Sequence, residues 1–72
     1  MDEERIVVAI RAARRIARVY RHPETAPEWS EIRSDLVDAK SFYESLPYKT
    51  ADQAVNYYHV CSALLPSQQG RE

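Results

Sequence analysis

Arginines are the residues whose type and spacing could do chemistry in this chain. Residues 5–21 contain six arginines and no acidic residue, whereas residues 22–52 contain seven acidic residues against three basic ones. The guanidinium group is a planar fork of donors that pairs with carboxylates and phosphates. The segregation of charge therefore has two interpretations: a solvated helix face that keeps a small protein soluble, or a binding surface for phosphates or an acidic protein.

Catalytic and metal chemistry have little support in the sequence. His22 and His59 are isolated and Cys61 is the only cysteine, so no paired metal-ligand or redox spacing exists. An acidic ridge lacks a second set of ligands for a cation; it consists of Glu28, Glu31, Asp35 and Asp38. No glycine-rich phosphate loop or nucleophile elbow occurs. We therefore expect a non-enzymatic protein without catalytic residues, metal or cofactor.

A run of polar and aromatic residues could line a ligand pocket; it consists of Asn56, Tyr57, Tyr58 and His59. The favoured interpretation is that both tyrosines are core or interface residues whose hydroxyls reach water, and that His59 points to solvent. Cys61 is interpreted as a small inward-facing residue rather than a nucleophile.

Three helices are expected to position these residues in an all-α three-helix bundle. They span about residues 2–21, 26–45 and 51–65. Acidic residues fill the first turn of the first helix and arginines its last, as the helix dipole favours. Pro23 then ends this helix, because the residue before a proline is disfavoured in helical geometry.

Two capping boxes mark the starts of the other helices. Thr25 with Glu28, and Thr50 with Gln53, have the spacing in which a threonine caps the helix and the later side chain reaches back to it. Pro66 is expected to end the third helix at the preceding residue.

Heptad spacing predicts that the first two helices form an antiparallel hairpin. The two seams are Ile6, Ile10, Ala13, Ala17 and Tyr20, and Trp29, Ile32, Leu36, Ala39, Tyr43 and Leu46. The short connection sets a register in which Trp29 packs beside Tyr20, Ala17 beside Ile32, and Ala13 beside Leu36. The third helix has a seam of its own with a second stripe beside it: Ala51, Ala54, Tyr58, Cys61 and Leu65, then Tyr57, Val60 and Leu64.

This register gathers basic residues on one flank of the hairpin. The candidate partner-binding residues are Arg11, Arg14, Arg18, Arg21, Arg33 and Lys40. The other flank offers Ala9, Ile16 and Phe42, so the third helix is expected to cover that apolar flank. The basic residues would then have no counter-charge within the protein.

The size of the chain favours a single helical domain over residues 1–66 with a flexible tail over residues 67–72. The core of so small a domain seldom contributes more than about 3–5 kcal/mol to stability, and the sequence offers no disulfide or similar cross-link. We therefore expect a homodimer or higher homo-oligomer. The acidic start does not resemble a signal peptide, and no apolar run approaches the roughly 20 residues of a membrane span. With a lone thiol, these features favour a cytoplasmic protein.

The sequence thus predicts a small regulatory or inhibitory protein-interaction module with an arginine-rich face for an acidic partner. A binder of nucleic acid or an anionic nucleotide through the same face is the first alternative. It is less favoured because the net charge is −1, whereas nucleic-acid-binding domains are usually strongly basic. A structural oligomer subunit is the second alternative.

Overall fold

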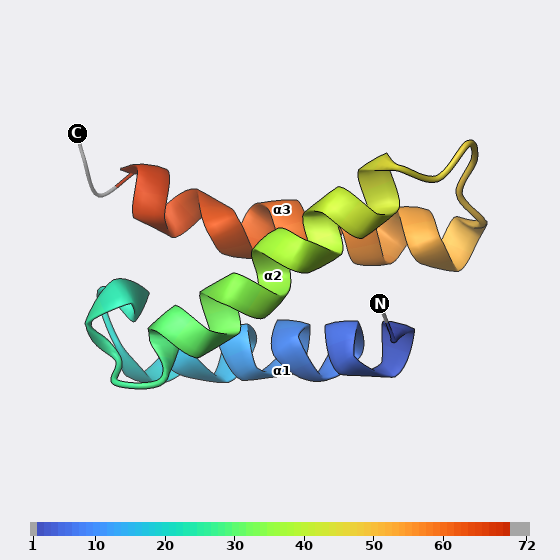
Figure 1. The fold of residues 1–72 in the computed structure, drawn as a ribbon. Coiled ribbons are helices and arrows are strands. Elements are labelled where there is room, and N and C mark those ends of the chain that lie inside the picture. Colours follow the sequence, from blue (N-terminus) through green and yellow to red (C-terminus); the bar gives the residue numbers. More distant parts are fainter. Residues whose placement is uncertain (1, 70–72) are drawn as a thin grey trace.

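The computed structural model describes residues 2–69, and the side chains of residues 2–65. Three α-helices and one short 3₁₀ helix follow one another: α1 (Glu3–Val19), η1 (Pro23–Thr25), α2 (Trp29–Glu44) and α3 (Ala51–Gln69) (Figure 1). Each α-helix packs against both others, and the described residues contain no strand. The expected all-α three-helix bundle is confirmed.

The ends of α1 follow its sequence closely. The Asp2 side chain caps the helix by accepting a hydrogen bond from the Glu4 backbone N–H at 3.0 Å, which satisfies one donor that the first turn leaves free. At the other end, the Tyr20 N–H donates to the Ile16 carbonyl at 2.8 Å. The helix ends at Val19, within two residues of the expected end.

The start of α2 is later than expected, because the capping box of Thr25 and Glu28 does not form. Thr25 lies in η1, where its hydroxyl donates to the His22 carbonyl at 2.7 Å, and Glu28 makes no side-chain cap. Ala26 is extended, with φ −68° and ψ 137°, because a residue before proline is disfavoured in helical geometry. Pro27 therefore delays the start of α2.

The start of α3 is the capping box that the sequence predicts. The Gln53 N–H donates to the Thr50 hydroxyl at 3.1 Å, and the Thr50 N–H donates to the Gln53 side-chain oxygen at 2.9 Å. The helix extends past its expected end at Leu65 to Gln69. The fixed φ of Pro66 is compatible with helical geometry, although this proline supplies no backbone donor. Residues 67–69 of the expected tail thus belong to α3, and residues 70–72 lie outside the described part.

The two threonines provide a matched test of these helix starts. Thr50→Ala removes a cap and is expected to lower the free energy of unfolding by about 1 kcal/mol. Thr25→Ala should cost clearly less, because the Thr25 hydroxyl bonds a loop carbonyl and caps no helix. Urea denaturation followed by circular dichroism measures both. Equal losses for the two variants would show that the capping assignment is wrong.

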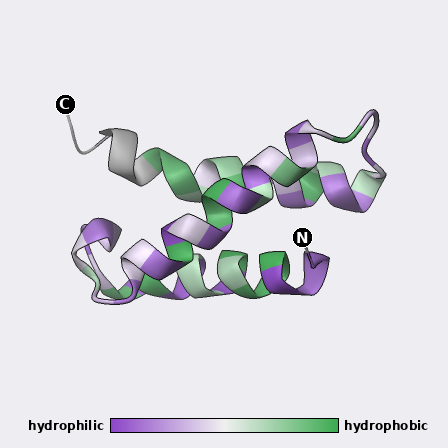
Figure 2. Ribbon diagram, viewed as in Figure 1, coloured by the Kyte–Doolittle hydropathy of each residue, from purple (hydrophilic) through white to green (hydrophobic). Residues whose placement is uncertain are grey.

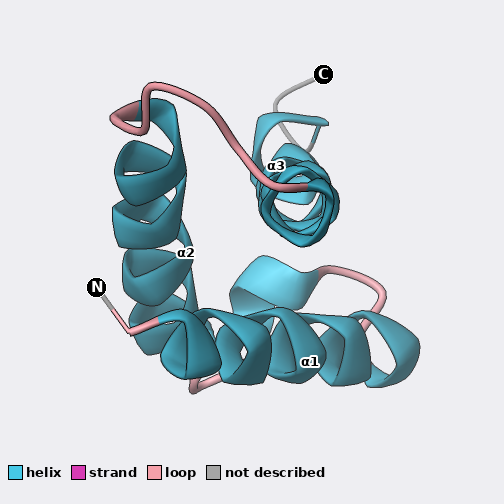
Figure 3. Cartoon of the chain, turned by 90° about the vertical axis from the view of Figure 1, so that its right-hand side faces the viewer, coloured by secondary structure: helices cyan, strands magenta, loops and turns pink. Residues whose placement is uncertain are grey.

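The first two helices run in opposite directions but do not lie along each other. Figures 1 and 3 show α2 crossing α1 at a wide angle, so that the two helices diverge. A heptad seam keeps helices in contact over their whole length only when they are nearly aligned. The crossing therefore limits how much of the predicted seam can pack.

The core contains most of the predicted seam residues, and Figure 2 shows the alternation of apolar and polar residues along each helix. The buried residues are Ile6, Ala9, Ile10, Ala13, Ile16, Ala26, Trp29, Ile32, Leu36, Ala39, Tyr43 and Val60. Ala17 is exposed, so the predicted layer of Ala17 with Ile32 is wrong. Ala17 instead lines a cavity together with residues of α2 and α3. The other layers stay predictions.

The inward face of α3 is its second apolar stripe. Val60 is fully buried, with Tyr57 and Leu64 packed against the core, whereas Tyr58 and Leu65 of the predicted seam are 68% and 46% exposed. The seam assigned to α3 is therefore wrong. Both stripes are apolar enough to pack, so the positions of α1 and α2 decide which one turns inward.

Candidate functional site

The third helix lies on the basic flank of α1 and α2, and not on the apolar flank as expected. The Arg14 side chain of α1 bonds the His59 ring Nδ1 of α3 across 3.3 Å. On the other side, the Tyr57 hydroxyl of α3 donates to the Glu44 carboxylate of α2 at 2.7 Å. The prediction overlooked Glu44. Its carboxylate accepts the hydrogen bond from Tyr57 and neutralises Lys40, so that α3 can pack on this flank with its polar side chains satisfied.

Lys40 is neutralised by this arrangement. Its ammonium group lies 2.9 Å from the Glu44 carboxylate, and the Lys49 ammonium lies 4.9 Å from the centre of the Tyr57 ring. Hydrogen bonds from Lys40 and Tyr57 lower the pKa of Glu44. The bond to Glu44, together with burial, raises the pKa of Tyr57 to about 12. Lys40 thus has a partner within the chain.

Four arginines of α1 line a groove of about 310 Å³, which we call the arginine groove. They are Arg11, Arg14, Arg15 and Arg18. Their spacing places them on one face of the helix, over two successive turns. Among the residues that the structure describes, no carboxylate pairs with any of them. The groove is therefore a concentration of positive charge that the described chain leaves uncompensated.

The structure brings together only part of the predicted basic face. Arg11, Arg14 and Arg18 share the groove, whereas Arg21, Arg33 and Lys40 do not line it. Arg21 follows the end of α1 and Arg33 is exposed on α2. Arg21 leaves the row of α1 arginines because the helix ends at Val19 and Tyr20 is extended. For Arg33 and Lys40 of α2, the prediction assumed helices aligned with α1, whereas the two helices cross at a wide angle.

Arg15 is a groove residue that the predicted face omitted. The heptad assignment placed it outside the flank of the seam. Its spacing from Arg11 and Arg18, four residues and three residues, was the signal that could have found it, because such residues share one side of a helix.

The acidic ridge consists of Glu28, which precedes α2, and three residues within that helix. Asp35 pairs with Arg5 at 3.0 Å, while Glu28, Glu31 and Asp38 are exposed. Within residues 2–69, no three histidine, cysteine, aspartate or glutamate side chains lie close enough together to hold a metal ion.

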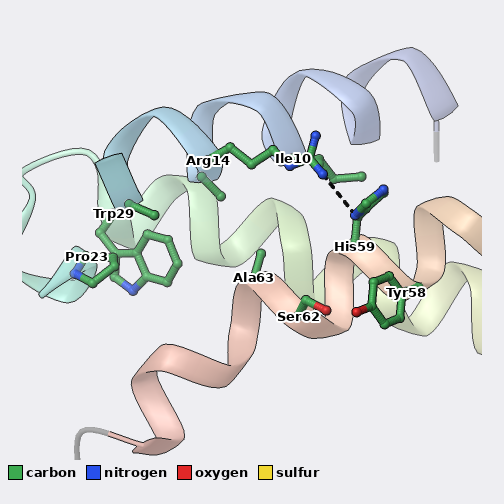
Figure 4. Close-up of a pocket in the computed structure, with 10 residues that line it drawn as sticks. Ile10, Arg14, Pro23, Trp29, Tyr58, His59, Ser62 and Ala63 are labelled. Carbon is green, nitrogen blue, oxygen red and sulfur yellow. Dashed lines mark hydrogen bonds between the residues drawn. The ribbon is translucent and has the colours of Figure 1, made fainter. Parts of the chain in front are cut away.

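A second cavity, of about 350 Å³, lies between α1, the start of α2 and α3, and we call it the Trp29 pocket (Figure 4). Its apolar lining is Ile10, Ala13, Ala17, Pro23, Trp29 and Ala63. Its polar lining is Arg14, Tyr58, His59 and Ser62. Arg14 also lines the arginine groove, so the two cavities adjoin at this side chain.

The interpretation of the polar-aromatic run is partly wrong. Tyr58 and His59 both line the Trp29 pocket, and their rings meet edge to face with centres 5.6 Å apart. His59 is half-buried and bonded to Arg14, so it does not simply point to solvent. Tyr57 does not line the pocket. Which of these three residues line the pocket depends on the side of α3 that faces α1. The sequence offered two apolar stripes on α3 and did not decide between them.

Comparison of the chain with protein-family models, with curated proteins and with solved structures found no match. No helix in the described part of the chain is both long enough and apolar enough to cross a membrane. The case for function therefore depends on the geometry of the two cavities.

Proposed function

We propose that this protein is a non-enzymatic protein-interaction module that binds an acidic segment of another protein in the arginine groove. One observation carries the proposal: four guanidinium groups share one groove without a carboxylate partner in the described chain. In the same chain, Arg5 and Lys40 do have carboxylate partners. The groove is thus a site where anionic groups from outside find unused donors.

The electrostatics of the helix support this function. Like charges three or four residues apart destabilise a helix by about 0.2–0.5 kcal/mol per pair. Carboxylates seated between the arginines relieve that repulsion, and each guanidinium can bind a carboxylate through two parallel hydrogen bonds. A regulatory or inhibitory role follows naturally for a small module that covers an acidic surface of its partner. The lone thiol favours a reducing, cytoplasmic location.

Self-association is the second candidate function, because large apolar side chains are exposed on two helices. Val8 and Val19 of α1 are 60% and 73% exposed, and Val55 and Tyr58 of α3 are 54% and 68% exposed. A second copy could cover either helix face. If the second copy also occupied the arginine groove, its acidic ridge, and not a different protein, would supply the carboxylates that bind there.

The test uses a short poly-glutamate peptide as the probe, with poly-glutamine of the same length as the control. The glutamate peptide is expected to bind, and its affinity should fall severalfold when the ionic strength rises from about 0.05 M to about 0.5 M, because added salt screens exposed charges. Calorimetry or fluorescence anisotropy measures both affinities.

Two results would overturn the proposal. One is an affinity that is indifferent to salt or equal for the two peptides. The other is a much tighter complex with a single-stranded oligonucleotide of equal charge, which would favour the alternative of a nucleic-acid or nucleotide binder.

A further inference from the structure

We propose that the Trp29 pocket binds a small amphipathic carboxylate, a molecule with an aromatic or aliphatic body and one carboxylate group. This site is separate from the arginine groove and does not depend on the acidic protein partner, although Arg14 lines both cavities. Its size, its apolar part and its polar part each contribute to the assignment.

The size of the pocket suits a small molecule. Its volume of about 350 Å³ lies near the lower end of the roughly 300–1,000 Å³ that small-ligand pockets occupy. Small side chains keep the space open, because Ala13 and Ala17 of α1 and Ala63 of α3 are part of its lining. A folded partner could not enter so small a space.

The apolar end of the pocket offers a platform for the body of the ligand. Trp29 is only 5% exposed, yet its ring lines the cavity beside Pro23 (Figure 4). An apolar group that replaces water between this ring and the alanines gains the usual free energy of burial. The apolar end thus selects a ligand with a hydrocarbon or aromatic portion.

The polar end supplies the charge that selects a carboxylate. One guanidinium N–H of Arg14 is directed to the His59 ring nitrogen, which orients the side chain towards α3 (Figure 4). A guanidinium has five donors and no acceptor, so further donors remain for an anion. Tyr58 and Ser62 are one turn apart on α3 and both line the pocket. Their hydroxyl groups lie beside each other, away from Trp29 (Figure 4).

The exposure of Ala17 is explained by the same cavity. Ala17 occupies a seam position that the heptad pattern assigns to the core, yet it is exposed and lines the pocket. A place where local pattern and packing disagree is often a functional site in an otherwise consistent sequence.

The experiment titrates the whole protein with 4-phenylbutyrate and follows the fluorescence of Trp29, the only tryptophan in the chain. The two control ligands are 4-phenylbutanol and 4-phenylbutylamine, which share the body and differ in the charge of the head. Saturable binding of the carboxylate is expected with a Kd on the order of 1 mM, as ligands of this size allow. The alcohol and the amine should bind about tenfold more weakly, because neither pairs with Arg14.

Three variants assign the binding to this pocket. Arg14→Gln should reduce carboxylate affinity to that of the alcohol, and Ala17→Leu should weaken all three ligands, because leucine occupies the cavity. Arg15 lines the arginine groove but not the Trp29 pocket. Arg15→Gln should therefore lower the affinity for poly-glutamate and leave the affinity for phenylbutyrate unchanged. Circular dichroism of each variant establishes that it is folded, and Ala17 and Arg15 are exposed helical positions.

Several outcomes would overturn the pocket assignment. They are a linear fluorescence change up to the solubility limit, equal affinity for the carboxylate and the alcohol, and undiminished binding to a folded Ala17→Leu variant. None of these outcomes bears on poly-glutamate binding in the groove. The pocket assignment can therefore be wrong while the proposed function is right, and the proposed function can be wrong while the pocket assignment is right.

Discussion

Leu36→Ala is expected to leave most of the protein unfolded at room temperature. The Leu36 side chain is 0% exposed and belongs to the core cluster that α1, α2 and Val60 of α3 share. Truncating a leucine in such a position costs about 2–5 kcal/mol, including the cavity that it leaves. A domain of this size has about 3–5 kcal/mol to lose. Circular dichroism before and during urea denaturation measures the change.

Val37→Ala is the matched control for this prediction. Val37 is the next residue of the same helix, but its side chain is 38% exposed. Its truncation removes little packing, and alanine is the better helix former, so the loss should stay below about 1 kcal/mol. If Leu36→Ala were as stable as the parent, or if both variants lost the same free energy, the packing of α2 would be different from that described.

The double change Arg11→Glu with Arg15→Glu is expected to abolish binding of the poly-glutamate peptide. It reverses two charges of the arginine groove, so that two glutamates lie beside the remaining Arg14 and Arg18. The groove then no longer attracts an acidic segment. Neither residue lines the Trp29 pocket or bonds His59, and both are exposed. Helicity and the free energy of unfolding should therefore stay close to those of the parent, as for most surface substitutions.

A second double variant, Arg21→Glu with Arg33→Glu, controls for net charge. It changes the charge of the chain by the same amount at two exposed residues outside the groove. Peptide binding should fall only modestly, because only the long-range electrostatic attraction of the protein is reduced. This small loss should disappear with added salt. Equal loss of binding in the two variants would show that the groove has no special role.

Sedimentation of the same variants separates a foreign partner from a second copy. If the groove binds a different protein, reversal of Arg11 and Arg15 leaves the oligomeric state unchanged. If it binds the acidic ridge of another copy, that reversal dissociates the oligomer. Adding Glu31→Lys and Asp38→Lys, both at exposed positions, should then restore it.

The helices and most of the core were predictable because they depend on local rules. Thr50 caps a helix as its spacing from Gln53 predicts, and apolar residues at helical spacing identified Leu36 and Tyr43 as core. The capping box at Thr25 failed for an equally local reason. Pro27 excludes Ala26 from helical geometry, and this restriction outweighs the gain from a cap.

The site was less predictable because it depends on how the helices cross. Regular heptads indicated aligned helices, which would have brought Arg33 and Lys40 beside the arginines of α1. In the structure α2 crosses α1 at a wide angle. Arg33 and Lys40 do not line the arginine groove, and Ala17 is exposed and lines the Trp29 pocket. The face that α3 turns inward is set by two nearly equal stripes, and only the shape of the α1–α2 pair decides between them. No pattern within a single helix contains that information.

The most direct test of the arginine groove is a side-chain NMR titration. Spectra of the arginine Nε–Hε groups, assigned by single Arg→Gln substitutions, are recorded as poly-glutamate peptide is added to the parent protein. The signals of Arg11, Arg14, Arg15 and Arg18 are expected to shift together and to saturate at one common affinity, while those of Arg21 and Arg33 change little. Shifts of equal size at all arginines, or none that saturate in the groove, would contradict the proposal that the groove is the binding surface.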